Sequence, residues 1–231
     1  MSTTDTVRLN KYLALQLGVS RREADDLIKN GTVTVNDVVA EIGARIQPAD
    51  RVSVSRTRLP QKIRDLDYIL LNKPTGYVCS RRAQGSTPTI YRLIPHHYHH
   101  LKPVGRLDAN SSGLLLMTND GDFANQMTHP KFHKVKIYNV RLDRDLEPLH
   151  QQMIGEIGID LEDGQSLLQL MRLSETNRRE WQVTMSEGRN RQIRRTFSAL
   201  GYKVVRLHRT NFGSYSIASI KPGELLPTQK L

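Results

Sequence analysis

The first forty residues show two helical patterns followed by a strand pattern. Apolar side chains recur at helical spacing over residues 9–17. Ser20 and Glu23 form a capping box, which predicts a second helix that Gly31 is placed to end. Residues 32–39 alternate between apolar and polar side chains around an Asn-Asp pair suited to a tight turn. These patterns predict a compact helix, helix and hairpin unit.

From residue 67 onward, short strand patterns alternate with fewer helical ones. The predicted strands cover residues 68–71, 114–117, 136–142, 181–185 and 203–207. The predicted helices cover residues 122–128, 147–156 and 191–200. This mixture is typical of an α+β domain built around a mixed, largely antiparallel central sheet.

The same patterns divide the chain into two domains and a connection. We expect a small N-terminal domain over residues 1–54 and a larger domain over residues 67–231. Residues 55–66 contain Pro60 and several basic side chains without a clear period, which is typical of an exposed linker.

Charge points to a polyanionic partner. The chain has 231 residues, with 34 Lys and Arg against 23 Asp and Glu, so the net charge is +11. Such a surplus favours nucleic acid through neutralisation of phosphates, although a charged surface also serves general solubility. The basic residues are concentrated in residues 186–209, where the one acid is Glu187.

The chain shows no sign of secretion or of a membrane span. Cys79 is the single cysteine, so no intrachain disulfide can form, and its expected role is packing. Charged residues interrupt the first apolar positions, and no stretch of 18 apolar residues occurs. We therefore expect a soluble cytoplasmic protein.

Residues 105–116 combine a polar loop with a strongly apolar strand. Asp108 lies in the loop, immediately before the run of large apolar side chains. A reactive side chain is often presented on a loop held by a rigid strand. The alternative from local chemistry alone is that Asp108 closes an Asx-turn before Ser111, Ser112 and Gly113.

The residues of this segment carry a family resemblance. Gly105-Arg106-Leu107-Asp108, followed by residues 112–121 (Ser-Gly-Leu-Leu-Leu-Met-Thr-Asn-Asp-Gly), resembles the signature of the RNA pseudouridine synthases. The N-terminal pattern resembles the S4-like (alpha-L) RNA-binding domain that one ribosomal branch of the family carries. The resemblance implies the pseudouridine-synthase fold, with an active-site cleft across its central sheet.

The resemblance also implies an activity, the isomerisation of uridine to pseudouridine in ribosomal RNA. The base is detached from ribose carbon-1 and rejoined through its carbon-5, so neither a metal nor a redox cofactor is required. The family's essential carboxylate corresponds to Asp108. It would act either as a nucleophile or as a base that gives a glycal intermediate, and the sequence does not choose between them.

Four further residues acquire roles from the resemblance. Arg194 would pair with Asp108 and keep it ionised in a water-poor cleft; alternatively, the arginines of this segment contact RNA phosphates. Tyr138 would stack on the flipped target base, although a tyrosine in an alternating strand is more often core. Arg106 would fill the RNA stack that the base leaves. Lys73 would support the site or contact phosphate.

The remaining predicted RNA contacts are basic or polar side chains in two segments. Basic residues at the start of the predicted second helix suit an incoming phosphate, because terminal amides also point there. The predicted RNA-binding residues, besides Arg106 and Lys73, are Arg8, Lys11, Arg21, Arg22, Arg189, Asn190, Arg191 and Arg195.

The four histidines within residues 96–100 are the one candidate metal segment. No cysteine lies nearby, and adjacent histidines on a short loop cannot easily converge on one ion, so we expect no metal and a position near RNA.

Two questions stay open in the sequence. Residues 187–195 and 124–130 look closer to the large-subunit branch of the family, and residues 76–80 to the small-subunit enzyme; we favour large-subunit RNA. The expected partner is ribosomal RNA or a ribosome-assembly intermediate, and we expect a monomer without a cofactor. The contrasting hypothesis is a non-catalytic RNA-binding assembly factor. An RNA hydrolase is a more distant third, because it usually needs paired acids with a metal or a general-base histidine.

Overall fold

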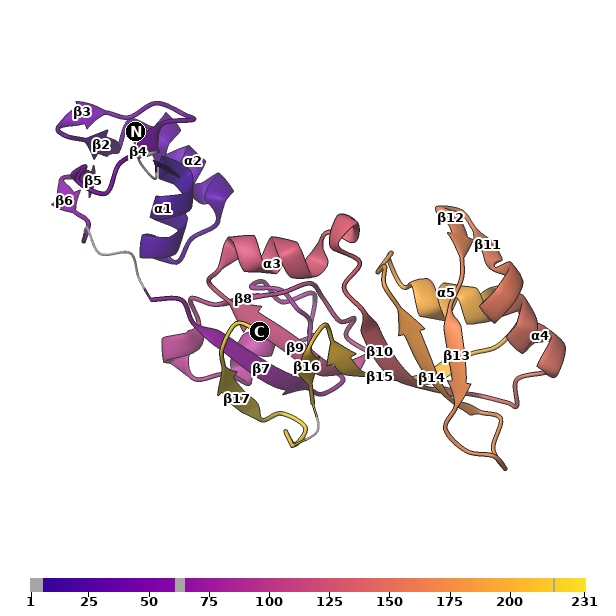
Figure 1. Cartoon of the computed structure of the whole chain (residues 1–231). Helices are drawn as coiled ribbons and strands as arrows, with labels where there is room; N and C mark the ends of the chain where they lie inside the picture. Colours follow the sequence, from indigo (N-terminus) through magenta and orange to yellow (C-terminus); the bar gives the residue numbers. More distant parts are fainter. Residues whose placement is uncertain (1–5, 61–64, 218) are drawn as a thin grey trace. The chain divides into compact units, whose positions relative to one another are not determined.

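The chain forms two compact units, which are described separately here. The computed structural model describes residues 6–60, 65–217 and 219–231. The first unit ends at Leu66 and the second spans Asp67–Leu231 (Figure 1). Among the described residues, no helix is long and apolar enough to cross a membrane.

The first unit packs two helices against small sheets. Helices α1 (Leu9–Leu17) and α2 (Arg21–Lys29) precede a four-stranded sheet in the order β3 (Val38–Val39), β2 (Val33–Val35), β5 (Val52–Val54) and β6 (Thr57–Arg58). Strand β1 (Val7–Arg8) pairs with β4 (Arg45–Ile46). The helix, helix and hairpin prediction is confirmed.

Local chemistry explains the boundaries of these elements. The Glu23 amide donates to Ser20 Oγ at 3.1 Å, and the Ser20 amide donates to Glu23 Oε2 at 2.6 Å, so the capping box is present. Asn36 and Asp37 both have positive φ, 51° and 71°, as a two-residue hairpin of primed type requires. Gly18 ends α1 in the left-handed conformation.

The predicted linker begins too early. Strand β6 lies within residues 55–66, pairs with β5, and is followed by Leu59, which packs against the core of the unit. Ser55 and Arg56 form the turn between β5 and β6, with φ values of 47° and 68°. The pairing of β5 with β6 could not be predicted from the sequence, because the residues of this hairpin are mostly basic and polar. The rest of the linker prediction falls partly on residues 61–64, outside the described residues.

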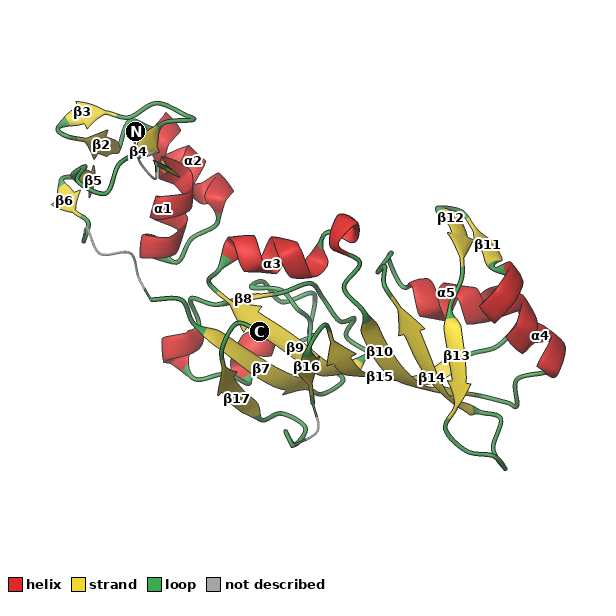
Figure 2. Ribbon diagram, viewed as in Figure 1, coloured by secondary structure: helices red, strands yellow, loops and turns green. Residues whose placement is uncertain are grey.

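A large mixed sheet organises the second unit (Figure 2). Its strands run in the order β13 (Gln169–Arg172), β14 (Glu180–Met185), β10 (Lys136–Leu142), β15 (Val204–Phe212), β9 (Ser112–Thr118), β7 (Tyr68–Lys73) and β17 (Leu225–Thr228). Strand β8 (Lys102–Pro103) pairs with β9, and β16 (Tyr215–Ser216) pairs with β15. Among the described strands of this sheet, β9 and β15 form the one parallel pair, so the predicted largely antiparallel topology is confirmed.

The helices of the second unit are short. They are α3 (Gly121–Thr128), α4 (Pro148–Gln152) and α5 (Gln192–Ala199). The helix predicted over residues 147–156 continues beyond α4 as a π-helical turn, Met153–Ile157. Three 3₁₀ turns, at Ile90–Arg92, His96–Tyr98 and Pro130–Phe132, and the hairpin of β11 (Ile159–Leu161) and β12 (Gly164–Ser166) had no clear period in the sequence.

Strand alternation distributes the helices over two faces of the sheet. Leu114 and Leu116 of β9 belong to the apolar cluster that includes Phe123 of α3. Leu115 points to the opposite face, in the cluster that includes Phe197 of α5. The β9 run is apolar throughout because it is covered on both sides.

A glycine brings β9 and β15 together. Gly113 has φ 111° and is paired with Arg209 across the parallel contact. A Cβ atom at Gly113 would lie 2.2 Å from the Arg209 carbonyl oxygen and 2.5 Å from its nitrogen. Backbone atoms cannot move aside as a flexible side chain can, so this position requires glycine.

We expect Gly113→Ala to destabilise the second unit by about 3 kcal/mol or more, since the clash adds to backbone strain. Urea unfolding followed by Trp181 fluorescence measures this, because Trp181 is the only tryptophan and is fully buried in this unit. Gly155→Ala is the matched control, since its Cβ would meet no atom closer than 3.7 Å. Equal stability of the two variants would contradict the close approach.

Candidate active site

A cleft of about 300 Å³ opens where the β9–β15 contact meets the loop before α5. One wall is the loop of residues 105–111, which leads into β9. The floor comes from β10 and β15, and the opposite wall from residues 188–193. Among the predicted site residues, those that line the cleft are Arg106, Asp108, Tyr138, Arg189, Asn190 and Arg191.

Asp108 forms an ion pair with Arg191 across the cleft. Arg191 Nη1 lies 3.2 Å from Asp108 Oδ2, and the two side chains are 44% and 36% exposed. Arg191 adopts a left-handed conformation, φ 47°, directly before α5, which turns its side chain toward the Asp108 loop. An ion pair this exposed contributes only about 0–1 kcal/mol to stability. The ion pair therefore matters because Arg191 positions the Asp108 carboxylate.

The predicted pairing of Asp108 with Arg194 is wrong as a direct contact. Arg194 instead donates to the backbone oxygens of Val204 and Asn110, both at 2.8 Å, and to Ser111 Oγ at 3.2 Å. It ties the start of β15 to the Asp108 loop. Burial lowers the pKa of the Arg194 guanidinium, Arg191 acts in the same direction, and Asp108 opposes both.

Lys73 holds the same loop from inside the fold. Its side chain is fully buried, and Nζ donates to the carbonyl oxygens of Ser111 at 2.7 Å, Asp108 at 3.0 Å and Pro74 at 3.1 Å. Burial lowers the pKa of the Lys73 ammonium. Of the two expected roles, the structure shows the support of the loop: Nζ is already bonded to three carbonyl oxygens, and Lys73 does not line the cleft.

Cys79 and a main-chain hydrogen bond also hold the Asp108 loop in place. Cys79 Sγ lies 3.3 Å from the Leu107 oxygen and 3.4 Å from its amide nitrogen, so the thiol packs against the loop as predicted. Burial raises the pKa of this thiol. The Ser111 amide donates to the Asp108 carbonyl oxygen at 3.0 Å. This main-chain bond closes the turn, and the Asp108 carboxylate faces Arg191.

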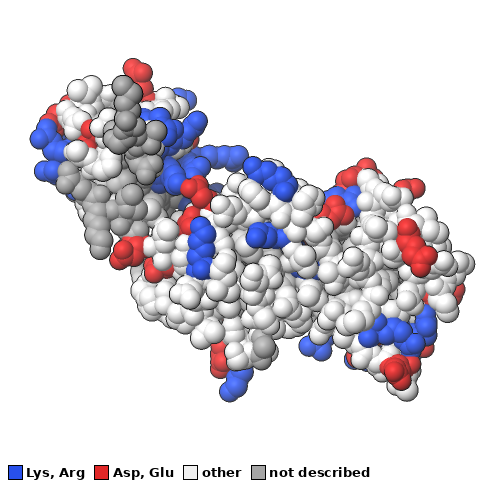
Figure 3. All heavy atoms as spheres, viewed as in Figure 1, with Lys and Arg blue, Asp and Glu red and all other residues white. Residues whose placement is uncertain are grey.

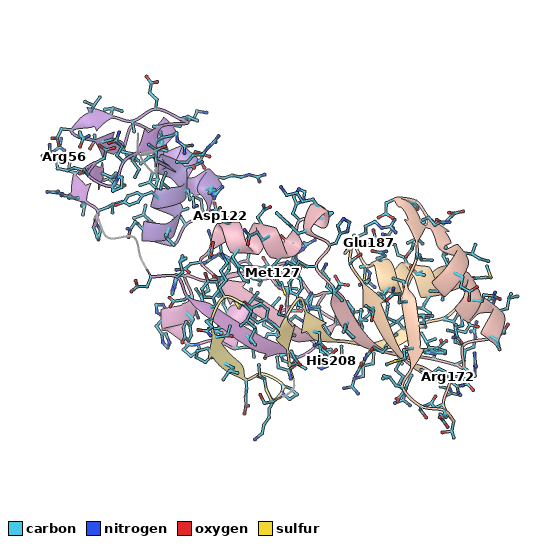
Figure 4. The ribbon with its side chains drawn as sticks, in the orientation of Figure 1. Arg56, Asp122, Met127, Arg172, Glu187 and His208 are labelled. Carbon is cyan, nitrogen blue, oxygen red and sulfur yellow. The ribbon has the colours of Figure 1, made fainter. Side chains whose placement is uncertain are left out.

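Two predicted RNA contacts, Arg189 and Arg195, are engaged within the protein. Arg189 Nη1 lies 3.0 Å from Asp163 Oδ1, and Arg195 Nη2 lies 2.6 Å from Asp163 Oδ2. Arg189 also contacts Glu187, which Figure 4 shows in the loop between β14 and α5. These contacts fasten the β11–β12 hairpin to the loop that carries Arg191, so both arginines hold the cleft wall; that they also contact RNA stays a prediction.

Tyr138 and Arg106 occupy different depths of the cleft. Tyr138 lies on the floor, where its residue is 8% exposed. Arg106 lies in the Asp108 loop and is exposed. Asn190 lies on the opposite wall and is also exposed. The buried aromatic ring and the exposed cation are compatible with the roles expected for Tyr138 and Arg106.

Arg209 is a cleft residue that sequence reasoning missed. It is 2% exposed, its Nε donates to the Leu114 carbonyl oxygen at 2.8 Å, and its guanidinium lies 4.8 Å from the centre of the Phe212 ring. The sequence contained one indication that Arg209 is buried. Arg209 lies two residues after Leu207, on the buried side of an alternating strand. An arginine in that register needs an internal partner.

The basic residues of the first unit keep their expected positions. Arg8, Arg21 and Arg22 are exposed, and Lys11 is half-buried. The capping box already uses the Glu23 amide and places the Glu23 carboxylate at the same end of α2. An incoming phosphate would therefore meet the arginine side chains more readily than this amide.

The histidine segment is held by the fold. His99 Nε2 lies 3.1 Å from the Ile94 oxygen, and His100 Nε2 lies 2.9 Å from Asp67 Oδ2. Over the part of the chain that the structure describes, no group of three or more His, Cys, Asp or Glu side chains could hold a metal ion. On the face in view in Figure 3, Lys and Arg side chains of the second unit are spread over the surface, and several lie next to Asp or Glu side chains.

We expect Lys73→Met to destabilise the second unit by about 1–3 kcal/mol, because three loop carbonyls lose one shared donor. Urea unfolding monitored by Trp181 measures the change. Lys131→Met is the control, since Lys131 is exposed beside the Phe132 ring. If both variants unfold like the wild type, Lys73 does not anchor the Asp108 loop.

Comparisons with known proteins agree on the family. The model of the RNA pseudouridylate synthase family matches residues 67–199, and that of the S4 domain matches residues 7–52. A crystal structure of a pseudouridylate synthase is similar with a TM-score of 0.67 and 32% identity, covering 96% of each chain.

Curated relatives are similar over nearly the whole chain. Ribosomal large subunit pseudouridine synthase B of Bacillus subtilis is 33% identical, over 94% of this chain and 90% of its own. Ribosomal small subunit pseudouridine synthase A of Pasteurella multocida is 36% identical, over 91% and 90%. That of Escherichia coli is 34% identical, over 96% of each. The chain belongs to the RNA pseudouridine synthase family and is an RNA pseudouridine synthase with an N-terminal S4 domain.

Proposed function

We propose that this enzyme converts a specific uridine of ribosomal RNA to pseudouridine, with Asp108 as the essential carboxylate. The observation that carries the proposal is the placement of Asp108: it lies in the cleft on a loop anchored by Lys73 and Arg194, and its carboxylate faces Arg191. A single reactive carboxylate suits an isomerisation, whereas an ordinary glycosidase uses a pair.

Each neighbouring group has a part in this proposal. Arg191 orients the carboxylate toward the ribose of the target nucleotide. Asp108 then either bonds to ribose carbon-1 or removes a ribose proton; the geometry is compatible with both. The Tyr138 ring supports the extruded uracil, and Arg106 enters the space that the base leaves in the RNA stack.

The choice of ribosomal RNA rests on the relatives and the first unit. Relatives named for the large and the small subunit are 33–36% identical to this chain, so they do not separate the two targets. Large-subunit RNA remains our prediction from residues 124–130 and 187–195. Action as a monomer, in the cytoplasm, on free RNA or an assembly intermediate belongs to the same proposal.

Chemical mapping of pseudouridine in ribosomal RNA tests the activity. We expect one site to be lost from cells that lack the gene and restored by the wild-type gene, but not by Asp108→Ala, because the carboxylate is removed. The purified variant should still bind the RNA that contains this site, since Asp108 adds negative charge. An unchanged map would favour a non-catalytic assembly factor, and restoration by Asp108→Ala would remove this residue from its role.

The first unit's part in binding has a separate test. We expect the double variant Arg21→Ala, Arg22→Ala to bind ribosomal RNA more weakly and to make the slope of log affinity against log salt shallower by about 1–2, because phosphate contacts are lost. Arg51→Ala is the control, since Arg51 pairs with Asp37 at 2.9 Å. A salt slope equal to that of the wild type would exclude this pair as a phosphate contact.

A further inference from the structure

Arg209 is a buried cation with a nitrogen left over for a ligand. Its Nε is satisfied by the Leu114 carbonyl oxygen, but Nη2 is buried and has no hydrogen-bond partner among the described residues. The residue lines the cleft that contains Asp108 and Tyr138. Leaving a charged donor unpaired in the interior is costly, so a bound molecule that brings an acceptor gains from it.

A second cation lies close to Arg209. The Lys136 ammonium is 5.4 Å from the centre of the Phe212 ring, on which Arg209 also stacks. Burial lowers the pKa of Lys136, and the charge of Arg209 acts in the same direction. Lys136 Nζ donates to the carbonyl oxygens of Lys134 and Glu187, both at 3.2 Å. Among the described residues that line the cleft, Asp108 is the one acid.

We propose that the Arg209 guanidinium, which lines the cleft, donates to a carbonyl oxygen of the target uracil and, with Lys136 beside it, stabilises the negative charge of the base while it is detached from the ribose. This inference rests on the proposed isomerisation. It adds a catalytic group to a site in which Asp108 acts on the ribose, since the other half of the reaction also needs a charge to be stabilised.

The charge arises from the bond that breaks. When the bond between ribose carbon-1 and base N1 is cleaved, its electron pair stays with the base, as an anion spread over N1 and the two carbonyl oxygens. The electron deficiency on the ribose is met by a bond to the Asp108 carboxylate or by loss of a ribose proton to it. Carbon-5 then supplies the pair for the new bond, the carbon-5 proton leaves, and N1 is protonated, so the composition is unchanged.

Position favours the base over a phosphate as the partner of Arg209. Tyr138 and Arg209 are direct cross-strand neighbours in the β10–β15 pair, and both are buried on the cleft floor. Side chains at such positions lie about 5 Å apart on one face, so a uracil resting on the tyrosine comes within reach of the guanidinium. Phosphates stay with the RNA backbone at the mouth of the cleft, where Arg106 and Arg191 are exposed.

An experiment with two different leaving bases distinguishes charge stabilisation by Arg209 from a purely structural role of this residue. The probe is a synthetic RNA that carries, at the position located by mapping, either uridine or 5-fluorouridine. Fluorine stabilises the uracil anion by itself, so the enzyme's cation then matters less. Because fluorine replaces the carbon-5 proton, loss of 5-fluorouridine reports cleavage of the bond to N1 and not the final deprotonation at carbon-5. We expect Arg209→Met to slow loss of the target uridine in single turnover by about 10²-fold, and to slow loss of 5-fluorouridine by a clearly smaller factor. Binding of the RNA should change little.

Two further variants complete the design. Arg209→Lys retains a charge while losing the forked donor, and we expect an intermediate rate with the same bias between the two bases. Arg178→Met is the matched control: Arg178 Nε donates to the Leu146 carbonyl oxygen at 2.7 Å, but the residue lies outside the cleft. Circular dichroism shows whether each variant is folded, and Arg209→Lys carries the test if Arg209→Met is not.

The outcomes are distinguishable. Failure of the wild type to convert the uridine RNA would refute the proposed function itself. With an active wild type, an equal loss of rate on both bases would overturn the inference and leave Arg209 a structural role. Weaker RNA binding with a shallower salt slope, and no bias between the bases, would instead identify Arg209 as a phosphate contact.

Discussion

The parallel contact between β9 and β15 is closer than a side chain at residue 113 would permit, and the site depends on it. A Cβ at Gly113 would overlap the Arg209 backbone. The contact joins the strand that follows the Asp108 loop to the strand that carries Arg209, so two elements almost a hundred residues apart in sequence form one cleft. The adjoining antiparallel strand β10 then brings Tyr138 to the same floor.

A buried lysine and a half-buried arginine, rather than the exposed ion pair, fix the Asp108 loop. Lys73 and Arg194 donate to six oxygens in total, of which Lys73 serves the carbonyl oxygens of Pro74, Asp108 and Ser111. Unmade bonds of this kind in the interior cost about 1–3 kcal/mol each, more than the half-exposed Asp108–Arg191 pair contributes. The protein therefore holds the backbone of the loop firmly and leaves its carboxylate accessible.

Helix caps, turns and buried strands could be predicted from the sequence. The partners that each charged side chain meets in the fold could not. The capping box at Ser20, the Asn36-Asp37 turn and the doubly covered strand β9 follow from residue types a few positions apart. Asp108 pairs with Arg191 and not with Arg194, and this depends on the left-handed conformation of Arg191 before α5. No periodic pattern in the sequence specifies that conformation. The internal partners of Lys73 and Arg189 could not be predicted either, because a basic side chain in the sequence does not reveal the carbonyl or carboxylate that it contacts in the fold.

The Asp108–Arg191 pair is exposed to solvent, and this exposure determines how strongly the two charges attract each other before and after a ligand enters the cleft. While both side chains are roughly 40% exposed, water screens their attraction. In the proposed mechanism, a nucleotide seated on the Tyr138 floor would displace that water, so the same separation would give a stronger attraction and hold the carboxylate more firmly. Arg209 differs because it is only 2% exposed and is already held by the Leu114 carbonyl oxygen. The proposed mechanism thus combines a charge pair that substrate binding strengthens with a cation that the fold has already placed.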